Sequence, residues 1–230
     1  MRDKTSKAWR WLSTIRALLW FDPRENELFR YFKAVSKQAA LPDQVVLVQC
    51  VEDPFYYGLF GQIASSLQEH ASVRIEAFVL RSLNVGESKS IFYFSVLRLI
   101  GVLQSRKWMR LYKAFCSGIG YSSTSFQPIH DVIDLYRSWA CWRNLKDRKA
   151  LVDLAIGGIA VGDLVNDSFL RFKPSHTVAL DDIYLWVVLW QTYRDVRRAK
   201  KYFEHVRPKI YLTSYSTYIQ HGIAVRVALR

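Results

Sequence analysis

The fold is decided by one stretch, Gln44-Val45-Val46-Leu47-Val48-Gln49-Cys50-Val51, which is a run of mostly β-branched and apolar residues. Such a run is typical of a strand buried on both faces of a parallel sheet. Glu52-Asp53-Pro54 then precedes an amphipathic helix over residues 55–70, and residues 73–79 repeat the strand pattern. Because a right-handed crossover places both strands in one sheet, this βαβ unit predicts an α/β fold with a Rossmann-like parallel sheet flanked by helices. Asp53 follows the first strand at the carboxyl edge, where ligands bind, and is a candidate substrate-binding residue.

The last residues of the chain predict a second passage from strand to helix. Residues 208–213 have the pattern of a short buried strand, residues 214–220 form a polar elbow, and residues 221–230 begin a helix. At such corners of doubly wound proteins, backbone N–H groups lack internal partners and bind phosphate or sugar groups. Because its residues 224–230 carry no Gly or Asn stop signal and no Pro follows them, we expect the domain to be truncated at its C-terminal end.

Composition restricts the class of protein and of partner. The chain has 230 residues, of which 50% are hydrophobic and 15% aromatic, so it can bury a full core. A net charge of +13 predicts attraction to an anionic partner: a phosphorylated substrate, an acidic lipid surface or nucleic acid. The three cysteines lack metal-ligand spacing and predict reduced thiols. The sequence contains no Asp-x-Asp pair, so we assign no metal-binding residue, and metal dependence stays open. No apolar run is long enough to cross a bilayer, so we expect a cytoplasmic protein.

The N-terminal residues predict a basic amphipathic helix. Residues 1–20 carry five cations against Asp3, and Trp11, Ile15 and Leu18 lie on one helical face. Such a helix suits an anionic membrane surface, and the alternative is an ordinary helix that packs on its own domain. We therefore expect a helical appendage over residues 1–40 and the α/β domain over residues 41–230.

Two further basic blocks occupy residues 98–113 and 194–201. The first interleaves its cations with Trp108, Leu111 and Tyr112, which predicts either a membrane face or a nucleic-acid face. The second ends a long predicted helix over residues 181–205, where cations complement the helix dipole. For both blocks the alternative is the solvated side of a helix.

The stretch with the strongest indication of chemistry runs from Gly157 to Phe172. It holds three glycines, two aspartates four residues apart, and an arginine four residues after the second aspartate. On a helix, Asp163, Asp167 and Arg171 share one face. Such a cluster beside glycine-exposed backbone suits sugar hydroxyls and a phosphate, or places a carboxylate as base for an attacking hydroxyl. The alternative is an ordinary helix N-terminus, where the helix dipole stabilises the acidic residues and an i, i+4 ion pair forms.

These residues resemble a family of bacterial surface-carbohydrate and capsular-polysaccharide biosynthesis proteins. The matches to its glycine-aspartate and aspartate-serine-x-leucine-arginine pattern are Gly162, Asp163, Asp167, Ser168, Leu170 and Arg171. The matches to its serine-x-x-x-tyrosine and glycine-x-x-x-arginine corner are Ser214, Tyr218, Gly222, Arg226 and Ala228. The chain departs from the pattern at Tyr215, where histidine is frequent, and at Asn166, where tyrosine is frequent, which implies a different donor or acceptor, or an impaired enzyme.

The resemblance implies a GT-B-like glycosyltransferase, of which this chain is the N-terminal, acceptor-side half. In that class two Rossmann-like domains face each other, and the second holds most of the nucleotide-sugar donor, a substrate rather than a tightly bound cofactor. The implied reaction transfers sugar from this donor to a lipid-linked glycan during capsular or other cell-surface polysaccharide biosynthesis. The implied location is peripheral, at the inner face of the cell membrane, where basic surfaces contact anionic lipid.

The resemblance also implies residue roles. Asp163 or Asp167 would orient or deprotonate the acceptor hydroxyl, and Arg171 would fix the carboxylates. His221 would serve as a base or contact phosphate, although a lone histidine at a helix start is also common as an ordinary polar residue. The implied substrate-binding residues are Arg171, Ser168, Ser214, Tyr218 and Gly222, and Asp53 joins them from the sheet edge.

Two alternatives stay open. A basic, aromatic-rich module that binds RNA or single-stranded DNA would explain the charge and the tryptophans. Its aromatics nevertheless fall mostly on apolar helix sides and the chain carries no RNA-binding signature, so nucleic acid is not the expected partner. The other alternative is an inactive, truncated remnant of the transferase.

Overall fold

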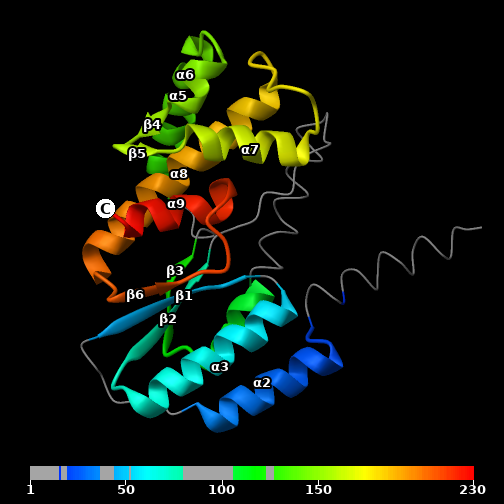
Figure 1. Ribbon diagram of the computed structural model, residues 1–230, viewed down its shortest axis with the longest axis vertical. Helices are drawn as coiled ribbons and strands as arrows, with labels where there is room; N and C mark the ends of the chain where they lie inside the picture. The colour runs from blue at the N-terminus through cyan, green and yellow to red at the C-terminus, as the bar shows by residue number, and fades with distance from the viewer. Residues whose placement is uncertain (1–15, 17–19, 37–43, 52, 80–105, 123–126) are drawn as a thin grey trace, which may run out of the picture.

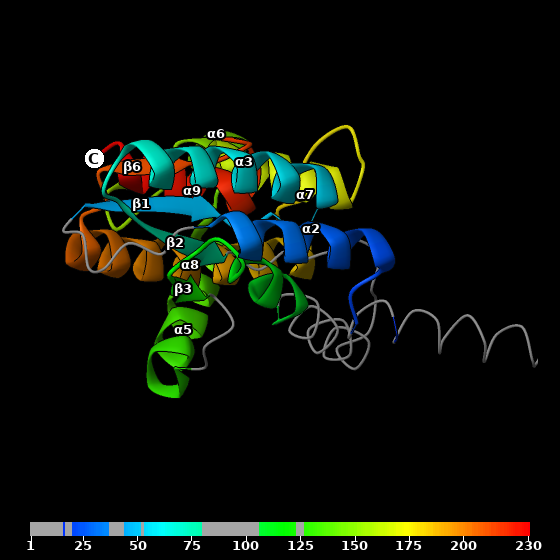
Figure 2. The ribbon, with the colours of Figure 1, turned by 90° about the horizontal axis from the view of Figure 1, so that it is seen from below.

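The computed structural model of the protein describes residues 16, 20–36, 44–51, 53–79, 106–122 and 127–230. Its centre is a sheet of four parallel strands in the order β3-β2-β1-β6 (Figure 1). The strands are β1 (Val45–Gln49), β2 (Arg74–Val79), β3 (Gly118–Ser122) and β6 (Ile210–Leu212). Helices cover both faces of the sheet, which confirms the predicted α/β fold with a parallel sheet flanked by helices (Figure 2).

The central strand β1 is buried along its whole length because both of its faces are covered. Val46 and Val48 pack into a cluster with α2 (Pro23–Val35) and α3 (Pro54–His70). Leu47 belongs to the opposite cluster, which α7 (Gly162–Phe172), α8 (Ile183–Val206) and α9 (Tyr218–Ala228) build. Successive side chains of a strand point to opposite faces, so this apolar run supplies both cores at once.

Strand β3 has no counterpart among the strands that the sequence predicts. Residues 118–122 pair in parallel with β2 at the edge of the sheet. Two glycines in five residues weaken the strand pattern, because glycine lacks a side chain to pack and loses more backbone entropy. The pairing with β2 overrides this weak local preference.

The order of strands creates a switch point beside β1. Helix α3 connects β1 to β2 on one side, whereas β6 pairs with the other side and leads into α9. Val48 aligns with Leu212, so β1 and β6 end at the same edge of the sheet. Because α3 and α9 then pack on opposite faces, the loops after these two strands diverge, and ligands bind at such a point in open α/β sheets.

The segment predicted as an N-terminal appendage contains a helix that belongs to the core. Helix α2 begins with a capping box between Asp22 and Glu25, and Phe32 is buried against Tyr57 of α3. Residues 23–35 are thus part of the packed α/β structure. The predicted amphipathic helix of residues 1–20 lies outside the described residues except for the exposed Arg16 and Trp20.

The described part of the first basic block does not form the predicted membrane or nucleic-acid face. Trp108, Leu111 and Tyr112 are buried in the core cluster beside α3. Lys107 is buried as well, and its Nζ lies 2.6 Å from Oε2 of Glu25. The aromatic residues therefore pack the core, and one cation of the block is neutralised inside the protein.

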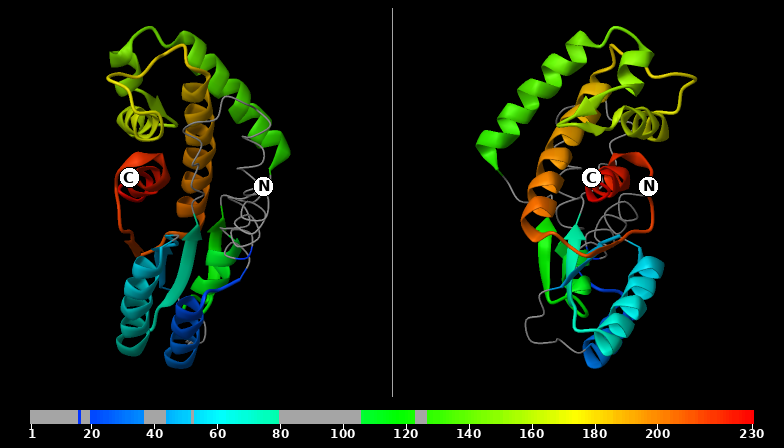
Figure 3. Two further views of the ribbon diagram at one scale, coloured as in Figure 1. Left: turned by 90° about the vertical axis from the view of Figure 1, so that its right-hand side faces the viewer. Right: turned by 60° about the vertical axis from the view of Figure 1, so that its left-hand side comes forward.

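The second basic block lies in the C-terminal half of α8, as predicted, but two of its arginines are buried. Helix α5 (Pro128–Asn144) lies along α8 (Figure 3), and Asp131 and Asp134 of α5 face three arginines. Asp131 Oδ1 lies 3.3 Å from Arg194 Nε and 3.0 Å from Arg198 Nη2, and Arg197 contacts both aspartates. Arg194 and Arg198 are buried, so these cations hold α5 on α8 instead of facing solvent.

Membrane-spanning segments are absent from the part of the chain that the structure describes. None of its helices combines the length and the apolar character that a bilayer crossing requires.

The ion network between α5 and α8 should contribute to the stability of the protein. Replacing Asp131→Asn leaves two buried arginines without their carboxylate, so we expect the free energy of unfolding to fall by about 3 kcal/mol. Urea denaturation measures this change. The exposed Asp153→Asn should stay within about 0.5 kcal/mol of the wild type. Equal midpoints for the two variants would contradict the inferred role of the network.

Candidate functional site

The glycines of the predicted site serve the protein's own turns and packing. Gly157 and Gly158 have φ of 58° and 81° and form the turn between β4 (Ala155–Ile156) and β5 (Ile159–Ala160). Gly162 begins α7, and a Cβ there would lie 2.0 Å from the carbonyl oxygen of Leu151 in α6 (Arg148–Val152). The close backbone approach that these glycines permit is therefore to protein and not to a ligand.

Ser168 and Gly222, both predicted to bind substrate, join α7 to α9. The Ser168 hydroxyl accepts a hydrogen bond of 2.9 Å from the backbone N–H of Ile219, in the first turn of α9. A Cβ on Gly222 would lie 2.6 Å from Leu164 Cδ2 and from the carbonyl oxygen of Ser216. Both residues are buried, so their contacts fix how the two helices pack.

Asp163 is held in a bidentate ion pair at the far end of α7 from Arg171. Its two oxygens accept hydrogen bonds of 2.6 and 2.5 Å from Arg226 of α9, which also contacts the carbonyl oxygen of Ala160. These hydrogen bonds lower the pKa of the Asp163 carboxyl. Eight residues of helix, about 12 Å, separate it from Arg171. Asp163 is thus a weak base, and Arg226 rather than Arg171 fixes its orientation.

Asp167 and Arg171 lie together beside the start of α9. With Leu170, Thr217 and Tyr218 they line a shallow hollow of about 350 Å³. The Arg171 guanidinium stacks on the ring of Tyr218, 4.4 Å from the ring centroid. Within the part of the chain that the structure describes, neither Asp167 nor Arg171 forms an ion pair. Both exposed charges therefore keep hydrogen-bonding capacity for a ligand.

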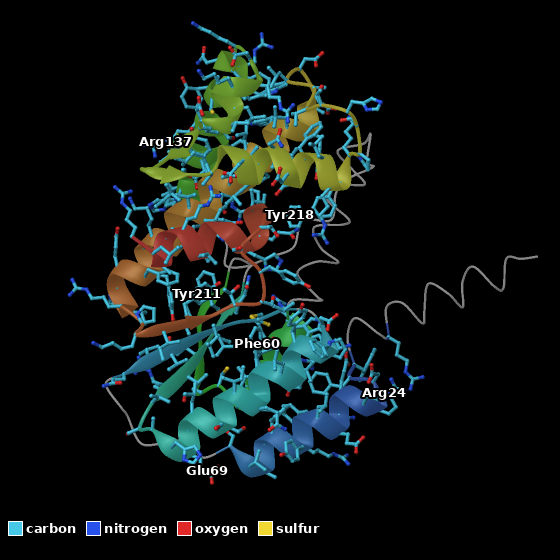
Figure 4. All side chains as sticks on the ribbon, viewed as in Figure 1. Arg24, Phe60, Glu69, Arg137, Tyr211 and Tyr218 are labelled. Carbon is cyan, nitrogen blue, oxygen red and sulfur yellow. The ribbon has the colours of Figure 1, made fainter. Side chains whose placement is uncertain are left out.

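Tyr218 has an unusual backbone conformation in this hollow. Its φ is +59°, in the left-handed region that non-glycine residues rarely adopt, and it is the first residue of α9 (Figure 4). Strain of this kind costs of order 1 kcal/mol and gathers at ligand-binding positions. The conformation places the ring under Arg171.

Gln49 connects the switch point to His221. The hydroxyl of Thr213 donates to Gln49 Oε1 at 2.5 Å, and Gln49 Nε2 lies 2.9 Å from His221 Nδ1. Gln49 Nε2 also lies 3.4 Å from the carbonyl oxygen of Gln220, which can only accept a hydrogen bond. The amide nitrogen of Gln49 must therefore face the histidine, where it donates to an unprotonated Nδ1.

His221 is consequently neutral, with its proton on Nε2. Burial, and then the positive charge of Arg171, lower the pKa of His221 from 6.5 to about 4. Protonation of Nδ1 would also set two donors, the imidazolium and the Gln49 amide, against each other. At neutral pH this side chain can donate a hydrogen bond through Nε2. It cannot serve as the predicted base, because Nδ1 already accepts from Gln49 and Nε2 carries the proton.

Two tyrosines span the edge where β1 and β6 end. The hydroxyl groups of Tyr56 on α3 and Tyr215 after β6 are 2.6 Å apart, and the ring of Tyr215 lies 5.2 Å from that of His221.

Asp53, predicted to bind substrate, instead caps α3 by accepting from the backbone N–H groups of Phe55 and Tyr56. Ser214 Oγ is buried and has no hydrogen-bond partner among the described residues.

The structure thus separates the predicted residues into two groups. Asp167, Arg171, Ser214, Tyr218 and His221 surround the start of α9, and we call them, with Gln49, the switch-point site. The residues Asp163, Ser168, Gly222 and Asp53 have partners within the protein that fix helices or caps. Gln49 and Thr213 were missed by sequence reasoning, and the available signal was a glutamine within an otherwise apolar strand.

Comparison with known proteins identifies no relative of this chain. No family model matches it, and neither the curated proteins nor the solved structures give a match. The resemblance to surface-carbohydrate biosynthesis proteins therefore rests on the residues quoted above.

The environment of His221 predicts a pH dependence of stability. Between pH 6.5 and about 4 the unfolded chain binds a proton that the folded chain does not, so stability is lost as pH falls through this window. The full loss is about 3 kcal/mol. In His221→Asn the amide oxygen can accept from Gln49 and does not titrate. The difference in unfolding free energy between wild type and His221→Asn should therefore change by this amount between pH 7 and pH 4, and a flat difference would contradict the assignment.

Proposed function

We propose that the chain is the acceptor-side half of a GT-B-like glycosyltransferase in capsular or other cell-surface polysaccharide biosynthesis. The observation that carries this proposal is the meeting of Asp167 and Arg171 with the first residue of α9 at the switch point of the sheet. A cation without an ion-pair partner suits a phosphate oxygen, and an exposed carboxylate beside it suits a sugar hydroxyl. A phosphate-bearing sugar presents both groups.

Asp167 is the base that this geometry favours. Its carboxylate would accept the proton of the acceptor hydroxyl while the hydroxyl oxygen bonds to C1 of the donor sugar. The bond between C1 and the phosphate oxygen breaks, and the nucleoside diphosphate leaves. Asp163 is the weaker candidate because Arg226 occupies both of its oxygens and lowers its pKa.

Arg171, Ser214 and His221 would bind rather than react. The guanidinium of Arg171 and the Nε2–H of His221 would donate to phosphate oxygens of a lipid-linked acceptor. The buried hydroxyl of Ser214 would gain a partner at the same time. The nucleotide-sugar would be held mainly by a second domain, and the lipid-linked acceptor places the reaction at the cytoplasmic face of the cell membrane.

Binding of glucose 1-phosphate, a probe that carries both chemical groups, tests the site. Arg171→Gln should weaken this binding by about tenfold or more, because a charge-assisted hydrogen bond is lost. Isothermal titration calorimetry measures the affinity. Arg226→Gln is the matched control, since it removes the same charge from a residue that serves structure. Weaker binding in Arg226→Gln alone would contradict the placement of the site.

A pair of aspartate variants tests the base. Asp167→Asn should lower sugar transfer by about a hundredfold or more while leaving the affinity for glucose 1-phosphate within a few-fold. The assay supplies labelled nucleotide sugars to membranes from cells that express the whole protein. Asp163→Asn should retain transfer and lose stability instead. The reverse order of activities would assign the chemistry to Asp163.

A further inference from the structure

Helix α5 has its polar side turned inward. Asp131 and Asp134 face the arginines of α8, and Ser138 is buried beside them. Large apolar side chains point outward instead, with exposed fractions of 74% for Ile129, 64% for Val132, 42% for Ile133, 73% for Tyr136 and 42% for Trp139. We call these five residues the α5 outer face. Figure 2 shows α5 projecting from the body of the molecule.

Exposed cations lie on α5 itself and directly after it in the chain. Arg137 and Arg143 are exposed on the same helix, and the exposed Lys146, Arg148 and Lys149 follow it. The two acids between residues 128 and 146 are both buried in the ion network with α8. Asp147 comes next and caps α6 by accepting from the backbone N–H of Ala150. The network with α8 thus removes negative charge from this surface.

We infer that the α5 outer face docks on an anionic lipid bilayer. Aliphatic side chains with tyrosine and tryptophan suit the boundary between headgroups and acyl chains, and arginines at their margin suit acidic headgroups. A second copy of the chain is the less favourable occupant, because two surfaces bordered by arginines, on chains of net charge +13, repel each other. None of the residues of the switch-point site lies on α5, so this inference does not depend on the proposed function.

Vesicle co-sedimentation of the full chain tests the inference. We expect binding to vesicles of phosphatidylglycerol mixed with phosphatidylcholine, and much weaker binding to phosphatidylcholine alone. Ile129→Gln combined with Tyr136→Gln should weaken binding by about tenfold or more, because two large apolar groups no longer enter the bilayer. Arg137→Gln combined with Arg143→Gln should weaken it by a similar factor, about tenfold, and more at low salt.

Matched controls remove the same chemistry from other helices. Phe55→Gln combined with Tyr31→Gln replaces side chains that are 72% and 48% exposed on α3 and α2. Arg24→Gln combined with Arg30→Gln removes two exposed cations of α2, which lies at the opposite end of the molecule from Arg137 (Figure 4). Both controls should bind vesicles as the wild type does. All four variants change exposed residues, and unchanged urea midpoints would show that they fold.

A local probe separates α5 from the N-terminal residues as the contact. A polarity-sensitive fluorophore on Ile129→Cys should shift to shorter wavelength when vesicles are added, and the same label on Phe55→Cys should not. Absence of vesicle binding would overturn the inference. So would vesicle binding that the α5 variants leave unchanged, since the contact would then lie elsewhere. A dimer in sedimentation that Ile129→Gln with Tyr136→Gln dissolves would assign the face to a second copy.

Discussion

The parallel pairing of β1 with β6 is the constraint on which the rest of the structure depends. It brings Gln49, at the end of β1, beside Thr213 and His221, which follow β6. It also directs the chain into α9, whose first turn must then pack on α7. Arg171 and Tyr218 consequently meet beside the same sheet edge. A site assembled from segments so distant in sequence exists only because these two short strands align.

Several cations of this protein are held in buried or partly buried ion pairs instead of facing solvent. Arg194 and Arg198 are buried against Asp131, Lys107 is buried against Glu25, and Arg226 clamps Asp163. Each of these pairs fixes the packing of helices. Arg171 differs from them, because among the described residues it stacks on tyrosine and has no acidic partner. The contrast separates cations that hold the fold from one that can bind a ligand.

Much of the fold was predictable from the sequence, whereas little of the site geometry was. The apolar run of β1 and the polar elbow before α9 have strong local patterns, so the parallel α/β sheet followed from them. Strand β3 could not be predicted because Gly118 and Gly120 give no strand signal and only pairing with β2 holds it. The partner of Asp163 was equally hidden, since Arg226 lies 63 residues away and reaches it only after α7 and α9 pack. Sequence spacing instead pointed to Arg171, one helical turn from Asp167.

The most direct test of the switch-point site is hydrogen–deuterium exchange of the chain with and without saturating glucose 1-phosphate. We expect slower exchange in the segments that follow β1 and β6 and in the last turn of α7. Protection confined to the N-terminal turn of α7 and the C-terminal turn of α9, around Asp163 and Arg226, would contradict it.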